Sequence, residues 1–288
     1  MVALKENIGF IGGGNMAFAI ALGLINRNVI QPNQILTSGP HIENLERWTK
    51  MGTSITVDNY EVVEKCDIIF LCVKPKILES CCKDLYKSSC NKLSIAAVDK
   101  IFLSVLAGVT LEQLEKSLKF YSDLNVKIIR TMPNTSVQIG EGCIIYTPNS
   151  AVTKSDLATI ELMLSPLGLA KEVPEQLINP LTGVAGCGPA FVYTIIEGLA
   201  DGALKQGVPK EMAVNFAAQT LLGASKTLLL TKKHPAVLRD EVCSPGGSTI
   251  VGVHELEKGN IRSILMNAVE KSVEKSAALG KSSSEKSQ

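Results

Sequence analysis

The sequence predicts an α/β protein, with a Rossmann-type doubly wound sheet over residues 1–173 and an all-helical domain over residues 174–280. Three observations predict this fold. Apolar strand-like runs alternate with helical patterns from Asn7 to about Val173, which is typical of a parallel sheet covered by helices on both faces. A glycine-rich turn directly follows the first strand. After about Pro174 the strand signal stops, and long runs rich in Ala and Leu follow.

The predicted strands and helices of the first domain follow one another at short spacing. The strands are expected at residues 7–12, 34–38, 66–73, 100–108 and 125–134, and the helices at Met16–Arg27, Ile42–Met51 and Pro75–Tyr86. Segment Lys87–Lys100 interrupts this rhythm and is predicted to be a surface insertion.

The second domain is predicted from three long runs, residues 188–208, residues 209–230 and Asn260–Leu279. The first two have a proline near their first turn, where proline is compatible with a helix. Because these helices are apolar nearly all round, one chain is not expected to cover them. We therefore expect a domain that dimerises through its own core. The polar residues 281–288 are predicted to form a disordered tail.

Composition excludes several classes of protein. The 288 residues are 45% hydrophobic but only 5% aromatic, which suits two aliphatic cores. The 29 basic and 28 acidic residues nearly cancel and form no basic stripe, so no nucleic-acid partner is expected. The longest apolar stretches are interrupted by Gly or polar residues before they reach membrane-spanning length, so no membrane partner is expected either.

The eight cysteines include no C-x-x-C pair, and with only three histidines no metal site is predicted. Neither a secretory signal nor an Arg-rich transit peptide precedes the first strand. We therefore expect a reducing compartment, the cytoplasm, with a mitochondrial location as the alternative.

The glycine-rich turn is the strongest local motif. Gly12, Gly14 and Ala17 form G-x-G-x-x-A between a strand and a helix. Gly12 permits the tight turn, Gly14 lets the backbone approach a pyrophosphate, and the helix N-terminus offers free N–H groups to the phosphates. A nicotinamide dinucleotide is the predicted cofactor.

The choice between NADP and NAD depends on the end of the second strand. An NAD site normally has Asp or Glu there to bind the ribose 2′-hydroxyl. Here Ser38 occupies the position, so no carboxylate repels a 2′-phosphate, and the Ser38 hydroxyl is a candidate donor to it. NADPH is therefore favoured, with NADH as the alternative because no Arg follows. Ser38 is alternatively an ordinary helix cap.

Two further turns are expected at the same edge of the sheet, where ligands of open α/β sheets bind. Lys74 and Pro75 follow a central strand, and Lys74 is either a cofactor contact or a solvated loop lysine. Gly108 and Pro133 end two other strands, either as simple stop signals or as residues that hold backbone amides toward the nicotinamide.

The run "HPAVLRDEVCSPGGSTIVGVHELEKGNIR" (residues 234–262) resembles the signature of the pyrroline-5-carboxylate reductase family. "TGVAGCGPAFVY", "VKP" and "TMPNT" are similar to further stretches of that family, in the same order. The resemblance covers Asn7 to Leu279. It implies hydride transfer from the nicotinamide C4 to the imine carbon of Δ1-pyrroline-5-carboxylate, which gives L-proline in the last step of its biosynthesis.

The S-P-G-G-x-T loop suits a small substrate that carries a carboxylate and a cationic ring nitrogen. Gly246, Gly247 and Ser248 can expose backbone N–H groups to the carboxylate at a helix start, and Ser244 is a second candidate contact. The Thr249 hydroxyl is predicted to face the ring nitrogen and is the one catalytic candidate, unless Thr249 only caps the helix. An imine that is already protonated needs little acid catalysis, so we nominate no general base.

Two acidic residues are weaker candidates for the substrate cation, Glu175 and Glu241, of which Glu175 is retained in the predicted substrate site. The chain departs from the family pattern at Glu241, where a neutral polar residue is common, and at Cys187, where Ser is common. The predicted cofactor-binding residues are Gly12, Gly13, Gly14, Asn15, Met16, Ser38, Pro40, Asn59, Val73, Lys74, Pro75, Ala107 and Gly108.

The resemblance also implies an assembly, namely homodimers that exchange the helical domain and join into decamers. Two other functions compete with the reductase. A β-hydroxyacid dehydrogenase needs a general base, usually a Lys on the interdomain helix, but the helix from Pro189 carries only the late Lys205. A protein that senses NADP without turnover has no need of the intact substrate loop.

Overall fold

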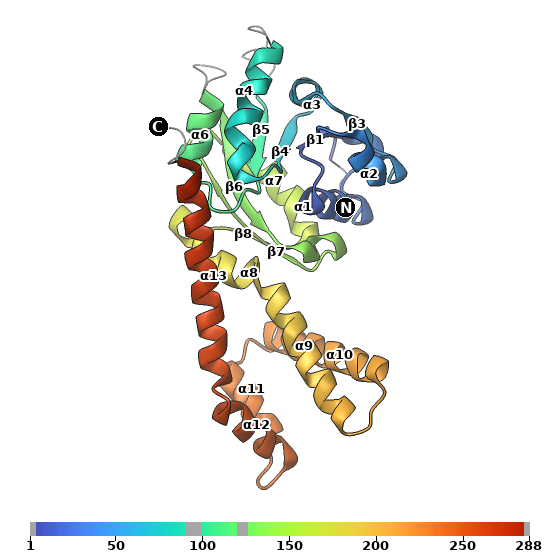
Figure 1. Cartoon of the computed structure of the whole chain (residues 1–288), viewed down its shortest axis with the longest axis vertical. Helices are drawn as coiled ribbons and strands as arrows, with labels where there is room; N and C mark the ends of the chain where they lie inside the picture. The colour runs from blue at the N-terminus through green and yellow to red at the C-terminus, as the bar shows by residue number, and fades with distance from the viewer. Residues whose placement is uncertain (1–3, 90–98, 120–125, 285–288) are drawn as a thin grey trace. The chain divides into compact units, whose positions relative to one another are not determined.

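The computed structural model describes residues 4–89, 99–119 and 126–284. The chain forms two compact units. The first unit comprises Met1–Gly186 with Ser272–Gln288, and the second comprises Cys187–Lys271. The first unit is a sheet with helices packed against it, and the second consists of helices (Figure 1).

One eight-stranded sheet forms the first unit, in the order β3-β2-β1-β4-β5-β6-β7-β8. The strands are β1 (Ile8–Ile11), β2 (Ile35–Ser38), β3 (Ser54–Thr56), β4 (Ile68–Leu71), β5 (Ile101–Ser104), β6 (Lys127–Pro133), β7 (Gly142–Pro148) and β8 (Gly168–Glu172). All neighbours pair in parallel except β6 and β7. The chain moves outward from β1 to β3 and then returns to β4 on the other side of β1. This reversal creates the switch point at which ligands of open sheets bind.

The central strands are buried on both faces because alternate side chains enter different cores. In β4, Ile68 and Phe70 join one cluster, and Ile69 and Leu71 join the other. Phe70 stacks on Phe10 of β1, with ring centroids 5.0 Å apart. Such a strand is a continuous apolar run without alternation, as is typical of parallel sheets.

Helices cover both faces of this sheet. The α-helices that belong entirely to the first unit are α1 (Asn15–Asn26), α2 (Glu46–Lys50), α3 (Asn59–Lys65), α4 (Leu78–Ser89), α6 (Leu111–Lys119), α7 (Lys154–Leu164) and α8 (Ile178–Ala185). Short 3-10 helices are η1 (Pro32–Gln34), η2 (Ile42–Leu45), η3 (Pro75–Ile77), η4 (Thr135–Ile139), η5 (Ser165–Leu167) and η6 (Glu175–Leu177). Residues of α1, α2 and α7 share one core cluster, and residues of α3, α4 and α6 share the other.

The second unit contains α9 (Gly188–Lys205), α10 (Lys210–Thr231), α11 (Pro235–Val242), α12 (Ser248–Lys258) and the first part of α13 (Ile261–Ser284). Helices α9 and α10 pack through the small side chains of Ala200, Ala213 and Ala217. By length and composition alone, Glu175–Lys205 is apolar enough to cross a membrane, although we expected every apolar run to fall short of that length. Only 11% of its apolar window is buried within this chain.

The predicted fold class is confirmed, and the differences lie in detail. Three strands, β3, β7 and β8, were not predicted. The predicted boundary at residue 173 falls one residue after β8, whereas the compact units divide at Gly186 because α8 packs on β6 and β7. Helix α13 reaches Ser284 and so extends four residues into the predicted tail, as a continuation of a helix whose preceding residues Ala277 and Ala278 are strong helix formers. Most of the predicted insertion Lys87–Lys100 lies outside the described residues.

Candidate active site

The glycine-rich turn between β1 and α1 has no space for side chains at its first two glycines. Gly12 adopts φ +102, and a Cβ there would lie 2.9 Å from the carbonyl oxygen of Cys72. A Cβ on Gly13 would lie 2.3 Å from Cδ2 of Leu45 and 2.9 Å from Nε1 of Trp48. Backbone conformation and the contact with Cys72 therefore require glycine at position 12, and a side chain at position 13 would displace Leu45 and Trp48.

Gly14 differs, because among the described residues, its chain neighbours aside, a Cβ there would meet no heavy atom within 4 Å. Gly14 is the N-cap of α1, and no side chain caps this helix. The first N–H groups of a helix have no partner within the helix and attract anions. The open side of Gly14 leaves room for the dinucleotide pyrophosphate, whose contact with this residue stays a prediction.

The predicted cofactor residues come together at one edge of the sheet. The parallel pairing of β1 with β2 and β4, and of β4 with β5, brings the carboxyl ends of four strands to the same side. The residues that follow these ends are Gly12, Gly13, Gly14, Asn15 and Met16 after β1, Pro40 after β2, Val73, Lys74 and Pro75 after β4, and Ala107 and Gly108 after β5. Lys74 is exposed and Gly108 has φ +79.

Ser38 ends β2 and is completely buried. Its hydroxyl donates to Oδ1 of Asn59 over 2.6 Å, and Nδ2 of Asn59 lies 3.5 Å from Sγ of Cys81. Burial raises the pKa of the Cys81 thiol to about 11, so this sulfur stays protonated at neutral pH. The Ser38 hydroxyl also lies 3.4 Å from the carbonyl oxygen of Phe10, so Asn59 is its closer acceptor. Ser38 caps none of the helices in the described part of the chain. Its contact with a 2′-phosphate stays a prediction.

Arg47 is a neighbour of the turn that we did not predict. Its guanidinium donates to the carbonyl oxygen of Gly13 over 2.7 Å and to Oδ1 of Asn15 over 2.9 Å. The sequence shows only that no arginine directly follows Ser38, and Arg47 lies further along the chain. Eight residues of chain separate Ser38 from Arg47, and no sequence pattern shows that α2 turns this side chain back onto the turn.

The predicted substrate loop forms the start of α12 in the second unit. Gly246 adopts φ +69, and the N–H of Gly247 donates to the carbonyl oxygen of Ser244 over 3.0 Å. Gly247 is the N-cap of α12, where no side-chain cap is present. The N–H groups at this helix start are a suitable site for a small carboxylate. The predicted Ser244, Gly246, Gly247, Ser248 and Thr249 are therefore contiguous in space.

Thr249 is the second residue of α12 and is half-buried. Among the residues that the structure describes, its hydroxyl makes no side-chain hydrogen bond. The alternative that Thr249 caps the helix is not supported, because Gly247 holds the cap position. Glu241 forms an ion pair with Lys233 over 2.6 Å, which offsets the negative charge at the position where this chain departs from its family.

Glu175 is engaged by protein groups of the first unit. Its Oε1 accepts from Nη1 of Arg130 over 2.9 Å and from the backbone N–H of Leu111 over 2.7 Å. Arg130 is 2% exposed, so it depends on this carboxylate for its charge partner. This structural role was not predicted, and the substrate contact of Glu175 stays a prediction.

Comparisons with known proteins decide the family. A family model described as pyrroline-5-carboxylate reductase dimerisation matches residues 175–279, and one described as NADP oxidoreductase, coenzyme F420-dependent, matches residues 7–108. Pyrroline-5-carboxylate reductase 3 of Xenopus laevis is 41% identical over 274 residues, which cover 95% of this chain and 96% of the relative. The chain belongs to the pyrroline-5-carboxylate reductase family.

Two further comparisons, with a relative and with a solved structure, indicate the same family. Pyrroline-5-carboxylate reductase of Arabidopsis thaliana is 37% identical and covers 96% of both chains. The crystal structure of Plasmodium falciparum pyrroline carboxylate reductase with NADP bound has a TM-score of 0.85 and 32% identity, and covers 97% of this chain and 100% of that one. The predicted family, reductase activity and NADP-type cofactor are confirmed, and the dehydrogenase and sensor alternatives are not supported.

Proposed function

We propose that this family member reduces Δ1-pyrroline-5-carboxylate to L-proline with NADPH, and that the loop at the start of α12 binds the substrate. The observation that carries the loop's role is its geometry. Gly246 and Gly247 bring the chain into α12 without a side chain that caps the helix, and the Thr249 hydroxyl, two residues after Gly247, is free of side-chain hydrogen-bond partners among the described residues. A small carboxylate fits the N–H groups at the helix start, and an N–H group next to it on the ligand fits the Thr249 hydroxyl.

Bound NADPH supplies the hydride from C4 of its nicotinamide. The chain's own residues bind and orient the other reactant. The N–H groups at the start of α12 hold the carboxylate, and the Thr249 hydroxyl accepts from the ring N–H. The hydride adds to the imine carbon, and the two electrons of the C=N π bond become the lone pair of the amine nitrogen. Because that nitrogen already carries its proton, positioning supplies most of the catalysis.

NADPH is the preferred cofactor in this proposal. No acidic residue follows β2, where the sequence continues with Gly39, Pro40 and His41, so a 2′-phosphate meets no like charge. Asn59 presents a carboxamide near the same strand end, and its orientation is held by Ser38 and Cys81. NADH lacks the phosphate that these groups would recognise.

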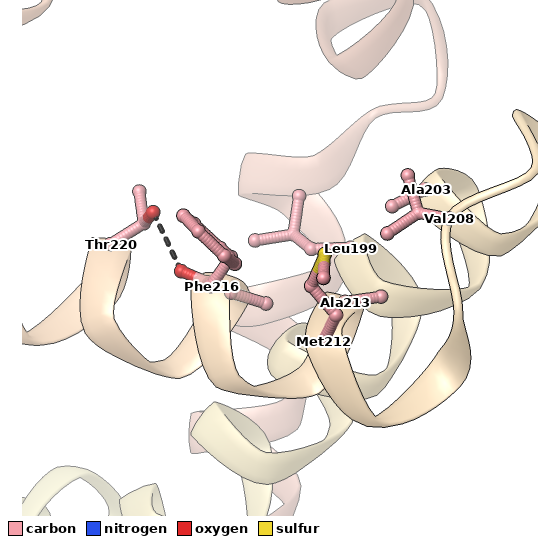
Figure 2. Close-up of a pocket in the computed structure, with 8 residues that line it drawn as sticks. Leu199, Ala203, Val208, Met212, Ala213, Phe216 and Thr220 are labelled. Carbon is pink, nitrogen blue, oxygen red and sulfur yellow. Dashed lines mark hydrogen bonds between the residues drawn. The ribbon is translucent and has the colours of Figure 1, made fainter.

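A homodimer is the proposed assembly, formed through the second unit. A groove on α9 and α10 is lined by Leu199, Ala203, Val208, Met212, Ala213, Phe216, Ala217 and Thr220 (Figure 2). Phe216 is 70% exposed and Leu230 is 82% exposed in the isolated chain. Exposed apolar surfaces of this kind mark protein–protein interfaces, and a second copy of this chain would bury them. This covering also accounts for the apolar character of Glu175–Lys205 without a membrane. A decamer of such dimers is the larger assembly proposed.

A reducing intracellular location, the cytoplasm, completes the proposal. The thiols of Cys66, Cys81 and Cys82 are buried and unpaired, which suits a compartment in which disulfides do not form. Localisation of a fluorescently tagged full chain, compared with mitochondrial and cytosolic markers, tests this part. A mitochondrial signal would contradict it.

The activity is tested with the purified protein, Δ1-pyrroline-5-carboxylate and NADPH. We expect substrate-dependent oxidation of NADPH and one proline for each NADPH consumed, measured by absorbance and by chromatography. Sedimentation of the same sample tests the assembly, since Phe216→Asp should shift the protein toward monomers. Oxidation of NADPH without proline formation would refute the proposed reaction.

A further inference from the structure

The helix α2 closes over the glycine-rich turn through two adjacent side chains. Nη2 of Arg47 and Nε1 of Trp48 both donate to the carbonyl oxygen of Gly13, over 2.7 Å and 3.2 Å. Trp48 is completely buried against Phe10 and Phe18, so its donor is fixed in place. Two donors on one carbonyl oxygen hold the orientation of the peptide plane that contains it.

This plane includes the N–H of Gly14. In a trans peptide the C=O and the N–H point in opposite directions, and the described residues contain no cis peptide. Because the Gly13 carbonyl is drawn toward α2, the Gly14 N–H points away from α2. Apart from Gly14 itself and its two chain neighbours, no heavy atom of the described residues lies within 4 Å of a Cβ placed on Gly14, so this residue faces open space. The two hydrogen bonds to the Gly13 carbonyl oxygen thus orient the Gly14 N–H as a donor to an anion.

Arg47 also holds the first residue of α1. Its Nη1 donates to Oδ1 of Asn15 over 2.9 Å, which engages the oxygen of the carboxamide and leaves the Nδ2 donor for a ligand. The guanidinium lies 4.6 Å from the centroid of the Phe18 ring, and its buried Nε has no hydrogen-bond partner among the described residues. A cation at a helix N-terminus opposes the helix dipole, so this placement favours anion binding more than it favours the fold.

We propose that Arg47 is a positioning residue for the cofactor, which orients the Gly13–Gly14 peptide and the Asn15 side chain toward the dinucleotide pyrophosphate. This inference rests on the proposed binding of NADPH at the turn. The pyrophosphate is common to NADPH and NADH, whereas the 2′-phosphate belongs to NADPH alone. Arg47 should therefore strengthen the binding of NADPH and of NADH equally and leave the preference between them unchanged.

The test compares Arg47→Met with wild type and with Lys50→Met. Methionine keeps an apolar side chain over Phe18 but removes the charge and both hydrogen bonds. Lys50 lies on the same helix and is 72% exposed in a pair with Glu46, so Lys50→Met loses the same charge away from the turn. The dissociation constants of NADPH and NADH are measured by fluorescence, and the inhibition constants of 5′-ADP and 2′-AMP against NADPH are measured in the reductase assay.

In Arg47→Met we expect the dissociation constants of NADPH and NADH and the inhibition constant of 5′-ADP to rise about tenfold. The inhibition constant of 2′-AMP, which has no pyrophosphate, and the kcat should not change. Lys50→Met should match wild type. Arg47→Lys keeps the charge but cannot bridge Gly13 and Asn15, so it should give an intermediate loss and serves if the methionine variant does not fold. The inference would be overturned if both folded Arg47 variants bound NADPH and NADH as wild type does. It would also be overturned if only NADPH and 2′-AMP bound more weakly. Failure of wild type to bind NADPH would instead refute the proposed function.

Discussion

The guanidinium of Arg130 donates from Nη1 to Oε1 of Glu175 over 2.9 Å, and this ion pair joins β6 to the segment that follows the last strand. The same carboxylate oxygen accepts the N–H of Leu111 at the start of α6. Nη2 of Arg130 donates to Asn179 over 2.8 Å. One acidic residue therefore fixes three elements of the first unit around a buried cation.

Replacement of Glu175 is expected to destabilise the protein. Glu175→Ala leaves the buried Arg130 without its charge partner, which should lower the free energy of unfolding by about 2–4 kcal/mol. Glu175→Gln keeps an acceptor and should cost less. Glu46→Ala, which removes an exposed partner of Lys50, is the control and should cost less than about 1 kcal/mol. Urea unfolding measures all three, and equal losses for Glu175→Ala and Glu46→Ala would contradict the buried role.

Gly14→Val should abolish binding of the dinucleotide without loss of stability. The space around Gly14 is open and its φ of −70 suits any residue, so valine fits the free protein but occupies the approach of the pyrophosphate. Gly13→Ala should behave in the opposite way and lower the Tm, because its Cβ would overlap Leu45 and Trp48. Calorimetry and NADPH titration measure both effects. Normal NADPH affinity in a folded Gly14→Val protein would remove the proposed cofactor site.

Ser38→Ala should reduce the preference for NADPH. The substitution removes the donor that fixes Oδ1 of Asn59, and loss of one such hydrogen bond corresponds to roughly a fivefold change in kcat/KM. We expect this loss for NADPH and none for NADH. Steady-state kinetics with each cofactor measure the ratio. An equal response of both cofactors would mean that Ser38 only supports the local fold.

Much of the fold was predictable because buried strands such as β4 are continuous apolar runs and because the glycine-rich turn lies between a strand and a helix. The missed β3 spans only Ser54–Thr56 and is too short for a pattern. The antiparallel β7 follows β6 through η4 with no crossover helix, so it breaks the alternation on which the prediction rested. The candidate site could be predicted where its residues are adjacent in sequence, as at residues 12–16 and 244–249, and its ligand contacts stay predictions. The contacts of Arg47 and of Glu175 join distant segments, and no local signal reveals them.

Stability should fall at alkaline pH. Burial raises the pKa of the Cys66 thiol from 9.0 to about 12. The native state therefore keeps this proton while the unfolded chain releases it, so stability present below pH 9 is lost as the pH rises toward 12. In Cys66→Ala this contribution disappears, and the difference in unfolding free energy between wild type and variant should shrink above pH 9, by up to about 1.4 kcal/mol per pH unit. Urea unfolding at pH 8.0–10.5 measures it, and a constant difference would contradict the assignment.

The most direct test of the account is the kcat/KM of Thr249→Val for Δ1-pyrroline-5-carboxylate. Valine keeps the shape and β-branching of threonine but lacks the hydroxyl, and Gly247 remains the cap of α12. Loss of one hydrogen bond to a charged group should lower kcat/KM roughly ten- to a hundredfold, while the dissociation constant of NADPH stays near wild type. Thr249→Ser, which restores the hydroxyl, should recover most of the activity. Full activity in a folded Thr249→Val protein would contradict the account, because the ring nitrogen would then have its partner elsewhere.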